Sequence, residues 1–147
     1  MSLPIIRRAA FNLLARRDYS QQEMIQKLKT KGYAVEEIKI IIDDLVKANY
    51  IDDARFSENY IRRRRHKGYG PKRIQLELQI HGIAAEIIAQ QLQFADNAWF
   101  IEVKKIWSKY FKGKTPPDMK NRAKQMRFLQ YRGFTQDQIE SVIEVWE

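Results

Sequence analysis

Apolar residues recur along the chain at the three- and four-residue spacings of helices that bury one side. The clearest stripe, in the first third of the chain, consists of Ile38, Ile41, Ile42, Leu45 and Val46. Because an α-helix completes a turn every 3.6 residues, these side chains fall on a single face. We find no strand with a convincing alternation of apolar and polar residues, and the chain has only 6 Gly and 4 Pro. The pattern predicts an all-α protein.

A motif of leucine, three variable residues, glycine and a bulky apolar residue occurs three times. The copies are residues 28–33, 78–83 and 129–134, and their glycines lie 50 and 51 residues apart. Six residues after each glycine the chain has an isoleucine, at Ile38, Ile88 and Ile139. Self-similarity at a fixed period is the signature of a repeat protein. The spacing therefore predicts three tandem repeats.

Each repeat is predicted to contain three helices. In the second repeat, Asp53 can cap a helix that runs through the arginine-rich stretch, and Pro71 begins a helix that ends at Gly82. A third, short helix follows. Capping boxes, in which a Ser or Thr N-cap is followed three residues later by Glu or Gln, begin at Ser20 and Thr135. We place the repeats at residues 1–52, 53–96 and 97–147.

Helices of this length do not hold together alone. A helix of about 8–14 residues is marginal in water, and a three-helix unit of about 45–50 residues barely buries a core. Stacked neighbours complete the core for one another. We therefore expect an elongated array of three tandem three-helix repeats, with more surface per residue than a sphere.

The sequence offers no catalytic or metal-binding constellation. It has no cysteine and only two histidines, which argues against thiolate sites and histidine-rich metal sites. Adjacent acids at positions 36–37 and 52–53 fall where helices are predicted to begin, and carboxylates there cap the helix and complement its dipole. We expect no enzymatic activity, no cofactor and no metal.

A glycine-rich turn, residues 67–73 (Lys-Gly-Tyr-Gly-Pro-Lys-Arg), suggests a phosphate-binding loop because it precedes a predicted helix N-terminus. However, the chain lacks the motif Gly-x-x-x-x-Gly-Lys-Ser/Thr, and no strand precedes the turn. We favour a helix-to-helix turn, in which the glycines allow a positive φ and Pro71 begins the next helix.

Positive charge is concentrated in the second and third repeats. The chain has 27 Lys/Arg against 18 Asp/Glu, a formal net charge of +9. Residues 54–97 and residues 98–147 each carry +4, and residues 1–53 carry only +1. Such a surface attracts polyanions or acidic protein faces.

The densest group of cations follows the first helix of the second repeat. Four consecutive arginines, residues 62–65, span roughly 300° of a helix, so at least one must approach the core with its aliphatic stem. Stabilisation of the helix dipole explains one or two of these cations but not all of them. We predict a functional basic surface, the basic ridge, with the heads of these side chains in water. The basic ridge comprises Arg55, Arg62, Arg63, Arg65, Lys67, Lys72 and Arg73.

Five aromatic residues cluster in one predicted helix of the third repeat. Phe100, Trp107 and Phe111 can share a face of this helix, which predicts that they form part of the core. Stacking on nucleic-acid bases is the alternative role.

Two stretches, one across the start of the second repeat and one within it, resemble the bacterial RecX regulatory proteins. Residues 50–56 (Tyr-Ile-Asp-Asp-Ala-Arg-Phe) are similar to the family pattern Tyr-Leu-Asp-Asp-x-Arg-Phe. Residues 67–78 match the pattern Lys-Gly-Tyr-Gly-Pro-x-Arg-Ile-x-x-Glu-Leu at every specified position. Ile51 replaces the usual leucine, and His81 stands where lysine is common. The repeats extend the resemblance over nearly the whole chain, and the third repeat matches least.

The resemblance implies a regulator that acts by binding. RecX proteins bind the filament of the RecA recombinase, lie along its groove, and inhibit its ATP hydrolysis, strand exchange and coprotease activities; some members also bind DNA. We therefore expect the RecA filament as partner, and single-stranded DNA bound directly or through the filament. A helical protein that binds nucleic acid directly is the alternative.

The sequence also bears on location and assembly. No apolar run approaches the length of a membrane span, and the N-terminus lacks the charge-then-apolar order of a secretory signal. We expect a cytoplasmic protein that does not bind membranes. Polar helices can cap both ends of the repeat array, so we expect a monomer.

Overall fold

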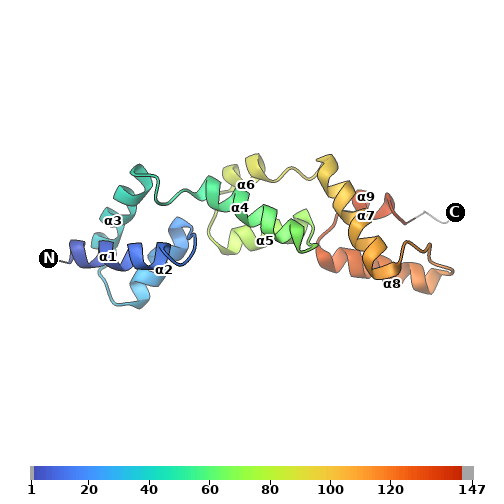
Figure 1. Ribbon diagram of the computed structural model, residues 1–147, viewed down its shortest axis with the longest axis horizontal. Helices are drawn as coiled ribbons and strands as arrows, with labels where there is room; N and C mark the ends of the chain where they lie inside the picture. The colour runs from blue at the N-terminus through green and yellow to red at the C-terminus, as the bar shows by residue number, and fades with distance from the viewer. Residues whose placement is uncertain (1, 144–147) are drawn as a thin grey trace. The chain divides into compact units, whose positions relative to one another are not determined.

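The structure, a computed structural model, describes residues 2–143, and within this range it contains α-helices and no strands (Figure 1). The described helices are α1 (Leu3–Leu14), α2 (Gln21–Thr30), α3 (Val35–Lys47), α4 (Asp53–His66), α5 (Pro71–Ile80), α6 (Ala85–Gln91), α7 (Asn97–Phe111), α8 (Met119–Arg132) and α9 (Gln136–Glu140). They follow one another as three groups of three. The prediction of an all-α protein with three-helix repeats is confirmed.

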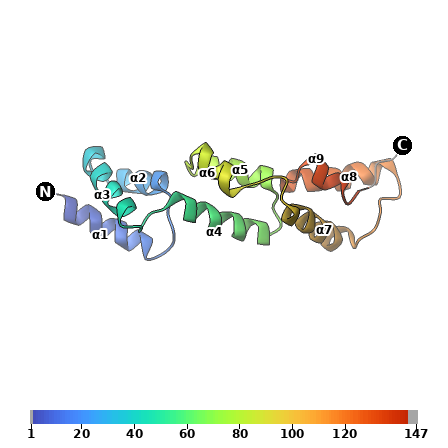
Figure 2. The same ribbon diagram turned by 90° about the horizontal axis from the view of Figure 1, so that it is seen from above.

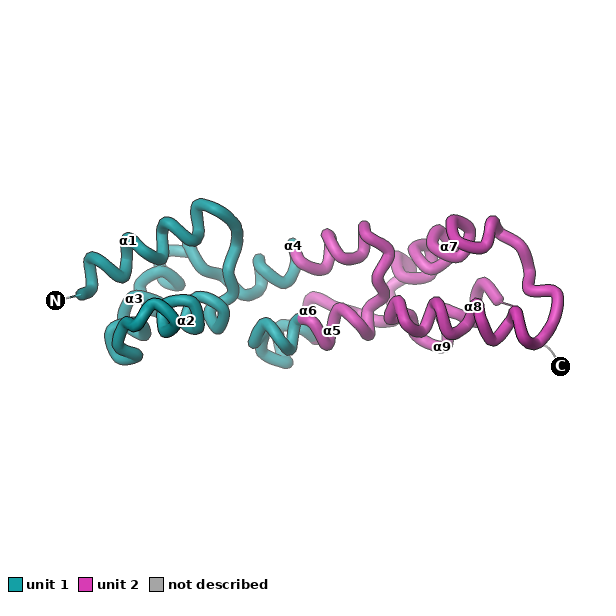
Figure 3. Tube along the Cα trace, turned by 90° about the horizontal axis from the view of Figure 1, so that it is seen from below, with its two compact units in different colours: residues 1–59, 78–88 teal, residues 60–77, 89–147 magenta. Residues whose placement is uncertain are grey.

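The chain forms two compact units (Figure 3). Unit 1 comprises residues 1–59 and 78–88, and unit 2 comprises residues 60–77 and the chain from residue 89 onward. Helices α4, α5 and α6 each contribute residues to both units. The repeat boundaries expected after residues 52 and 96 stay a prediction.

In unit 1, helices α1, α2 and α3 pack against one another (Figures 1 and 2). The buried face of α3 consists of Ile38, Ile41, Ile42 and Leu45, and Val46 is partly buried against the same core. The apolar stripe identified in the sequence is therefore the core-facing side of α3.

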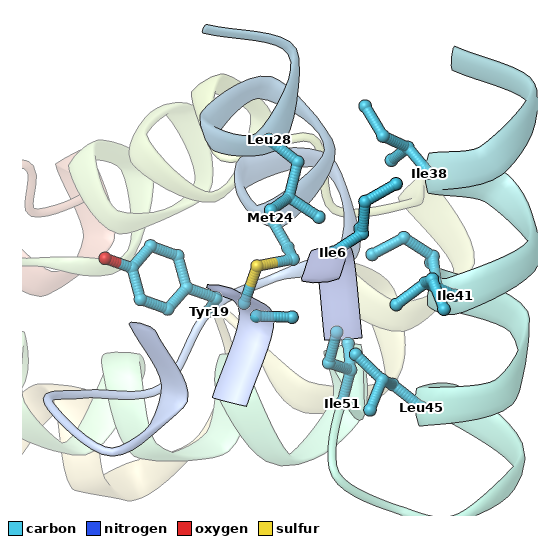
Figure 4. Close-up of a cluster of buried hydrophobic side chains, with 10 residues drawn as sticks. Ile6, Tyr19, Met24, Leu28, Ile38, Ile41, Leu45 and Ile51 are labelled. Atoms are coloured by element: carbon cyan, nitrogen blue, oxygen red, sulfur yellow. The ribbon is translucent and has the colours of Figure 1, made fainter. Parts of the chain in front are cut away.

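Side chains from all three helices meet in the core of unit 1 (Figure 4). Ile6 of α1 and Met24 and Leu28 of α2 lie opposite the isoleucines of α3, and all three are fully buried. Tyr19 and Ile51, from the turns before α2 and α4, belong to the same cluster. Burial of one such aliphatic side chain is worth about 1.5–3 kcal/mol, which explains how helices of 10–13 residues hold together here.

In unit 2, helices α7, α8 and α9 pack against one another. The buried positions of α7 are Trp99, Val103 and Ile106. They meet a core to which Leu129 of α8 and Ile139 of α9 also contribute buried side chains. The spacing of four and three residues along α7 is that of a single helix face.

The expected aromatic face of α7 is not its core face. Phe100, Trp107 and Phe111 are only partly buried, because the fully buried positions follow the register of Trp99. Trp107 lies at the margin, where its indole N–H donates to the Gln125 side chain at 2.9 Å. The helical spacing of the three aromatic residues correctly predicted that they share a partly buried side of α7, but the buried face of the helix is the neighbouring one, which includes Trp99.

The repeated glycine ends the middle helix of each repeat. Its φ is +93° at Gly32, +78° at Gly82 and +100° at Gly133, a backbone conformation that residues with a side chain rarely adopt. The capping boxes predicted at Ser20 and Thr135 are both present, at the starts of α2 and α9. The repeated glycine therefore marks the end of a helix, and the capping boxes mark the beginning of two helices.

Candidate partner-binding surface

The basic ridge occupies α4, the turn that follows it and the first turn of α5. Arg55 belongs to unit 1 and the other six residues belong to unit 2. The exposed members of the ridge are Arg55, Arg62, Arg63, Lys67 and Lys72, and the half-buried members are Arg65 and Arg73. The ridge therefore combines cations that reach solvent with cations that neighbouring groups hold.

The carboxylate of Glu77 on α5 gathers three donors in unit 2. Arg64 donates two hydrogen bonds to it, from Nε at 2.9 Å and from Nη2 at 2.8 Å, and the Tyr60 hydroxyl donates at 2.9 Å. Arg73 Nε donates a longer bond of 3.4 Å. About one fifth of the Arg64 and Glu77 side chains is exposed, so this pair is more shielded from water than an ordinary surface ion pair.

These contacts change how the groups ionise. Partial burial acts to raise the pKa of Glu77, but the hydrogen bonds from Arg64 and Tyr60 outweigh it and lower the pKa below its ordinary 4.5. Burial, together with the bond to the Glu77 carboxylate, raises the pKa of Tyr60 to about 12. Near neutral pH the group therefore consists of a carboxylate, a neutral phenol and two guanidinium ions.

The ring of Tyr69 lies among three arginines of unit 2. The guanidinium carbon is 4.0 Å from the ring centre for Arg64, 4.4 Å for Arg73 and 5.0 Å for Arg132. Cations over an aromatic face are attracted by its quadrupole, by about 0.5–1 kcal/mol at exposed sites. Of the four consecutive arginines, Arg64 and Arg65 are half-buried, whereas Arg62 and Arg63 are exposed.

The glycine-rich turn joins the beginning of α5 to the end of α8. The N–H of Gly70 donates to the carbonyl of Arg132 at 2.7 Å, and the N–H of Lys72 donates to the carbonyl of Gly133 at 2.9 Å. A Cβ on Gly70 would lie 2.5 Å from the carbonyl carbon of Gly133. The N–H groups that a phosphate would need are therefore already bonded to carbonyls, and the preferred interpretation as a helix-to-helix turn that begins at Pro71 is confirmed.

The expectation that all heads of the ridge lie in water is wrong for Arg73. Besides its bond to Glu77, its Nη1 donates to the carbonyl of Tyr131 at 3.4 Å. Arg65 also has a neighbour, because its guanidinium carbon lies 5.7 Å from the ring centre of Trp99. An acceptor provided by a distant carbonyl or ring is invisible in the local sequence, which shows only that a cation is present.

The remaining ridge residues divide in the same way. Arg55 donates to the carbonyls of Asn49 and Tyr50, at 3.0 and 3.3 Å, although its side chain is exposed. The ammonium groups of Lys67 and Lys72 form no ion pair or hydrogen bond with any residue between positions 2 and 143. Arg62 and Arg63 are exposed as well, and the guanidinium carbon of Arg63 lies 5.9 Å from the ring centre of Tyr60.

Comparison with known proteins places this architecture in a family. Models of the first, second and third three-helix domains of RecX match residues 7–45, 52–92 and 103–143. The Regulatory protein RecX of Pseudomonas putida is 40% identical over 134 residues, which cover 91% of this chain and 86% of that protein. That of Vibrio campbellii is 41% identical over 131 residues, covering 89% and 84%. This chain belongs to the RecX family.

Solved structures of RecX share the fold. The crystal structure of RecX from Lactobacillus salivarius matches with a TM-score of 0.83 at 23% identity, covering 96% of this chain and 94% of that one. Another crystal structure, of a regulatory protein RecX, matches with a TM-score of 0.81 at 20% identity. The resemblance inferred from residues 50–56 and 67–78 is confirmed, and RecX membership makes this chain a regulatory protein.

The RecX-like Asp52-Asp53 pair has two separate structural tasks in unit 1. Asp52 caps α4, since its carboxylate accepts from the N–H groups of Ala54 at 2.9 Å and Arg55 at 3.1 Å. Asp53, which we expected to cap this helix, instead accepts from the N–H of Gln21 in the first turn of α2, at 2.9 Å. Burial raises the pKa of Asp53 despite this bond. The sequence did not reveal this second task because Gln21 lies 32 residues away.

As the start of α5 contacts the end of α8 in unit 2, so the end of α5 contacts the beginning of α2 in unit 1; we call these two contacts joints. The hydroxyl of Ser20 donates to the carbonyl of His81 at 2.8 Å, and the Nδ1 atom of His81 lies 3.1 Å from the Glu23 carboxylate. His81 therefore joins the end of α5 to the start of α2 within unit 1.

The RecX-like residues of the second repeat are thus mainly structural. Gly70 bonds to the end of α8, Glu77 holds two arginines, and Tyr69 packs among three. One sequence signal pointed to Glu77, since it is the sole acid between Glu58 and Glu86 amid many cations. Across residues 2–143, no group of three His, Asp or Glu side chains could hold a metal ion. In the same range, no helix has both the length and the apolar character needed to cross a bilayer.

Proposed function

We propose that this RecX family member regulates the RecA recombinase by binding the filament that RecA forms on single-stranded DNA. It inhibits ATP hydrolysis, strand exchange and coprotease activity, and it acts by binding rather than by catalysis. The observation that carries the proposal is the RecX relationship across 91% of the chain. A net charge of +9 supports it, because such a surface is attracted to a filament that contains DNA.

The exposed part of the basic ridge is the proposed contact with the filament. Arg62, Arg63, Lys67 and Lys72 are exposed and belong to one unit. Arg65 and Arg73 contribute indirectly. Arg65 packs against Trp99 and so fixes the end of α4, and Arg73 bonds to Glu77 and so fixes the beginning of α5. We further propose that the protein acts as a cytoplasmic monomer.

The test is the rate of ATP hydrolysis by RecA on single-stranded DNA as this chain is added. We expect the rate to fall with increasing chain and to level off once the filament is saturated. A rate that does not change at a saturating concentration would overturn the proposal. In a parallel reaction without RecA, the purified chain with Mg²⁺ should hydrolyse neither ATP nor DNA.

Direct binding of nucleic acid is the second candidate, and the charge of +4 on residues 98–147 favours it. Affinity that comes from phosphate contacts falls steeply with salt, because bound counterions are released. A filament regulator should bind the RecA–DNA complex far more tightly than naked DNA at about 150 mM salt. Equal affinities at matched salt would favour the second candidate.

A further inference from the structure

Helix α7 and the turn after it carry a row of lysines in unit 2. Between residues 103 and 117 the chain has five lysines and no acidic residue. Three of them lie on α7, and the other two follow directly after the helix. The lysine row consists of Lys104, Lys105, Lys109, Lys112 and Lys114.

The lysine row lies on the side of α7 that faces away from the core. All five side chains are exposed, whereas the buried side of the helix is formed by Trp99, Val103 and Ile106. Lys104, Lys105 and Lys109, together with Ile101 and Ser108, line an open depression with a volume of ≈ 600 Å³. The row is therefore an accessible surface of the folded protein.

The ammonium groups of the row are almost entirely uncompensated. Lys105 lies 3.5 Å from the carboxylate of Glu102, and its side chain is 67% exposed. The other four form no ion pair or hydrogen bond through their ammonium groups with the residues described, 2 to 143, and the Lys109 ammonium lies 5.6 Å from the ring centre of Tyr110. Arginines of the same unit behave differently, because Arg64, Arg73 and Arg132 are held by Glu77, Tyr69 or nearby carbonyls. In unit 2, much of the arginine charge is thus used internally, while the lysine charge remains available.

The chemistry of the row matches a phosphate backbone. An ammonium group is a point charge that contacts phosphate oxygens without the fixed geometry of the arginine fork, so it carries no information about base sequence. Along the axis of α7, Lys104 and Lys109 are separated by about 7.5 Å, at 1.5 Å per residue. A linear series of charges without intervening acids suits a linear polyanion better than an acidic protein face, where charges of both signs are usual.

We propose that the lysine row binds the phosphate backbone of nucleic acid independently of its base sequence. The inference deepens the proposed function, on which it rests for the identity of that nucleic acid as the single-stranded DNA of the filament. The basic ridge of α4 and α5 then contacts RecA protomers, and the lysine row contacts DNA.

The experiment measures binding of the full chain to a fluorescent oligothymidylate by anisotropy, from 50 to 200 mM salt. The test variant is K104E/K105E/K109E, and K104Q/K105Q/K109Q removes the charge without reversing it. The control K27E/K29E/K31E changes the net charge equally, at three exposed lysines of unit 1. Circular dichroism and thermal melting confirm that every variant is folded.

We expect K104E/K105E/K109E to lose at least tenfold in affinity at about 50 mM salt, and the control to lose less than about threefold. The slope of log K against log salt should become shallower by about 2, since three phosphate contacts on a single strand contribute about 0.7 each. The glutamine variant should show the same loss of slope. A duplex of equal length should respond in the same direction, because the contact is with phosphates.

Three outcomes would overturn the inference. Equal losses in the test and control variants would mean that only net charge matters. Unchanged DNA affinity with weakened binding to RecA would mean that the row meets an acidic protein surface. Unchanged DNA affinity with normal inhibition of RecA would refute the lysine row and leave the proposed function standing. Conversely, a parent chain that never inhibits RecA, combined with the expected loss of DNA binding, would refute the proposed function alone.

Discussion

Gly82 at the end of α5 lies directly against Gln22 in the first turn of α2. A Cβ added to the glycine would come within 2.4 Å of the Cβ of Gln22. The glycine also has a φ of +78°, which disfavours any side chain. Position 82 therefore requires glycine for two independent reasons, one in the backbone and one in the contact with α2.

We expect Gly82→Val to destabilise the protein by more than about 1 kcal/mol, measured by urea denaturation or melting temperature. Gly32→Val is a matched control, since Gly32 has a φ of +93° but no atom within 4 Å of an added Cβ. The control should show the cost of the backbone conformation alone, about 1–2 kcal/mol, and the Gly82 variant a larger loss. A loss for Gly82→Val no larger than that for Gly32→Val would contradict the close contact between α5 and α2.

Glu77→Gln should destabilise the protein by about 1–2 kcal/mol at pH 7. The value lies between those of exposed and buried ion pairs, because about one fifth of the Arg64 and Glu77 side chains is exposed. Tyr60→Phe, which removes only one donor from the same carboxylate, should cost about 0.5–1 kcal/mol. Denaturation of both variants in urea tests the order, and a larger loss for Tyr60→Phe would show that Glu77 is not the centre of the group.

The pH dependence of stability gives a separate test of Glu77. Its pKa is lower in the folded protein than its ordinary 4.5, so the folded state binds fewer protons than the unfolded state near that pH. The stability contributed by the carboxylate is complete above about pH 4.5 and is lost as the pH falls through the lower folded value. The difference in unfolding free energy between the parent and Glu77→Gln should therefore shrink below about pH 4.5. A difference that grows on acidification would contradict the direction of the shift.

Asp53→Ala and Asp53→Asn should behave differently. Alanine removes the acceptor for the N–H of Gln21 and should cost about 1 kcal/mol, as for the loss of a helix cap. Asparagine keeps an acceptor oxygen for the N–H of Gln21. It also removes the charge whose partial burial raises the pKa of Asp53, so the effect of Asp53→Asn on stability should stay within about 0.5 kcal/mol. Thermal melting at pH 7 measures both, and equal losses would mean that the charge rather than the acceptor matters.

Reversing the exposed ridge should weaken filament binding without unfolding the protein. The variant R62E/R63E/K67E/K72E should lose at least about 2 kcal/mol of binding, from about 0.5–1 kcal/mol at each contact. The readout is inhibition of RecA ATP hydrolysis on single-stranded DNA, after helicity and melting have been checked. Inhibition equal to that of the parent would show that the ridge is only a solvated surface.

One further variant controls for net charge, and another tests the role of Arg73 in stability. K27E/K29E/K31E/K39E changes the charge equally at exposed lysines of unit 1 and should inhibit nearly as well as the parent. Arg73→Glu belongs to the stability tests, because it places a carboxylate beside Glu77 and Tyr131 and should lower the melting temperature. A melting temperature unchanged by Arg73→Glu would show that its contacts in unit 2 contribute little.

The sequence predicted those features whose causes lie within a few residues. Ser20 and Glu23 cap α2 within one turn, and Gly82 ends α5 by its own backbone conformation. The stripe that begins at Ile38 defines a helix face for the same reason. Periods and caps act locally, so the sequence alone was sufficient to predict helices that follow one another in groups of three.

The roles of the cations could not be predicted in this way. Arg73 and Glu77 lie one turn apart on α5, so their contact is local, but only folding brings Arg64, on the other side of the turn, to the same carboxylate. The partners of Gly70 are main-chain carbonyls at Arg132 and Gly133, which have no signature because every residue has a carbonyl. The density of arginines in the sequence overestimated how much of their charge faces water, since Arg64 and Arg73 are half-buried.

The joint between α8 and α5 has a consequence for how such chains diverge. Its hydrogen bonds run from the N–H groups of Gly70 and Lys72 to the carbonyls of Arg132 and Gly133. Every residue type has a main-chain carbonyl, and every type except proline has a main-chain N–H. Most side chains around the joint can therefore be replaced without loss of these hydrogen bonds, provided that the glycines are kept. One repeat can then become strongly cationic while another drifts toward neutrality on an unaltered scaffold. The charges of +1 for residues 1–53 and +4 for each of the two following segments show how much the segments of one chain differ in charge.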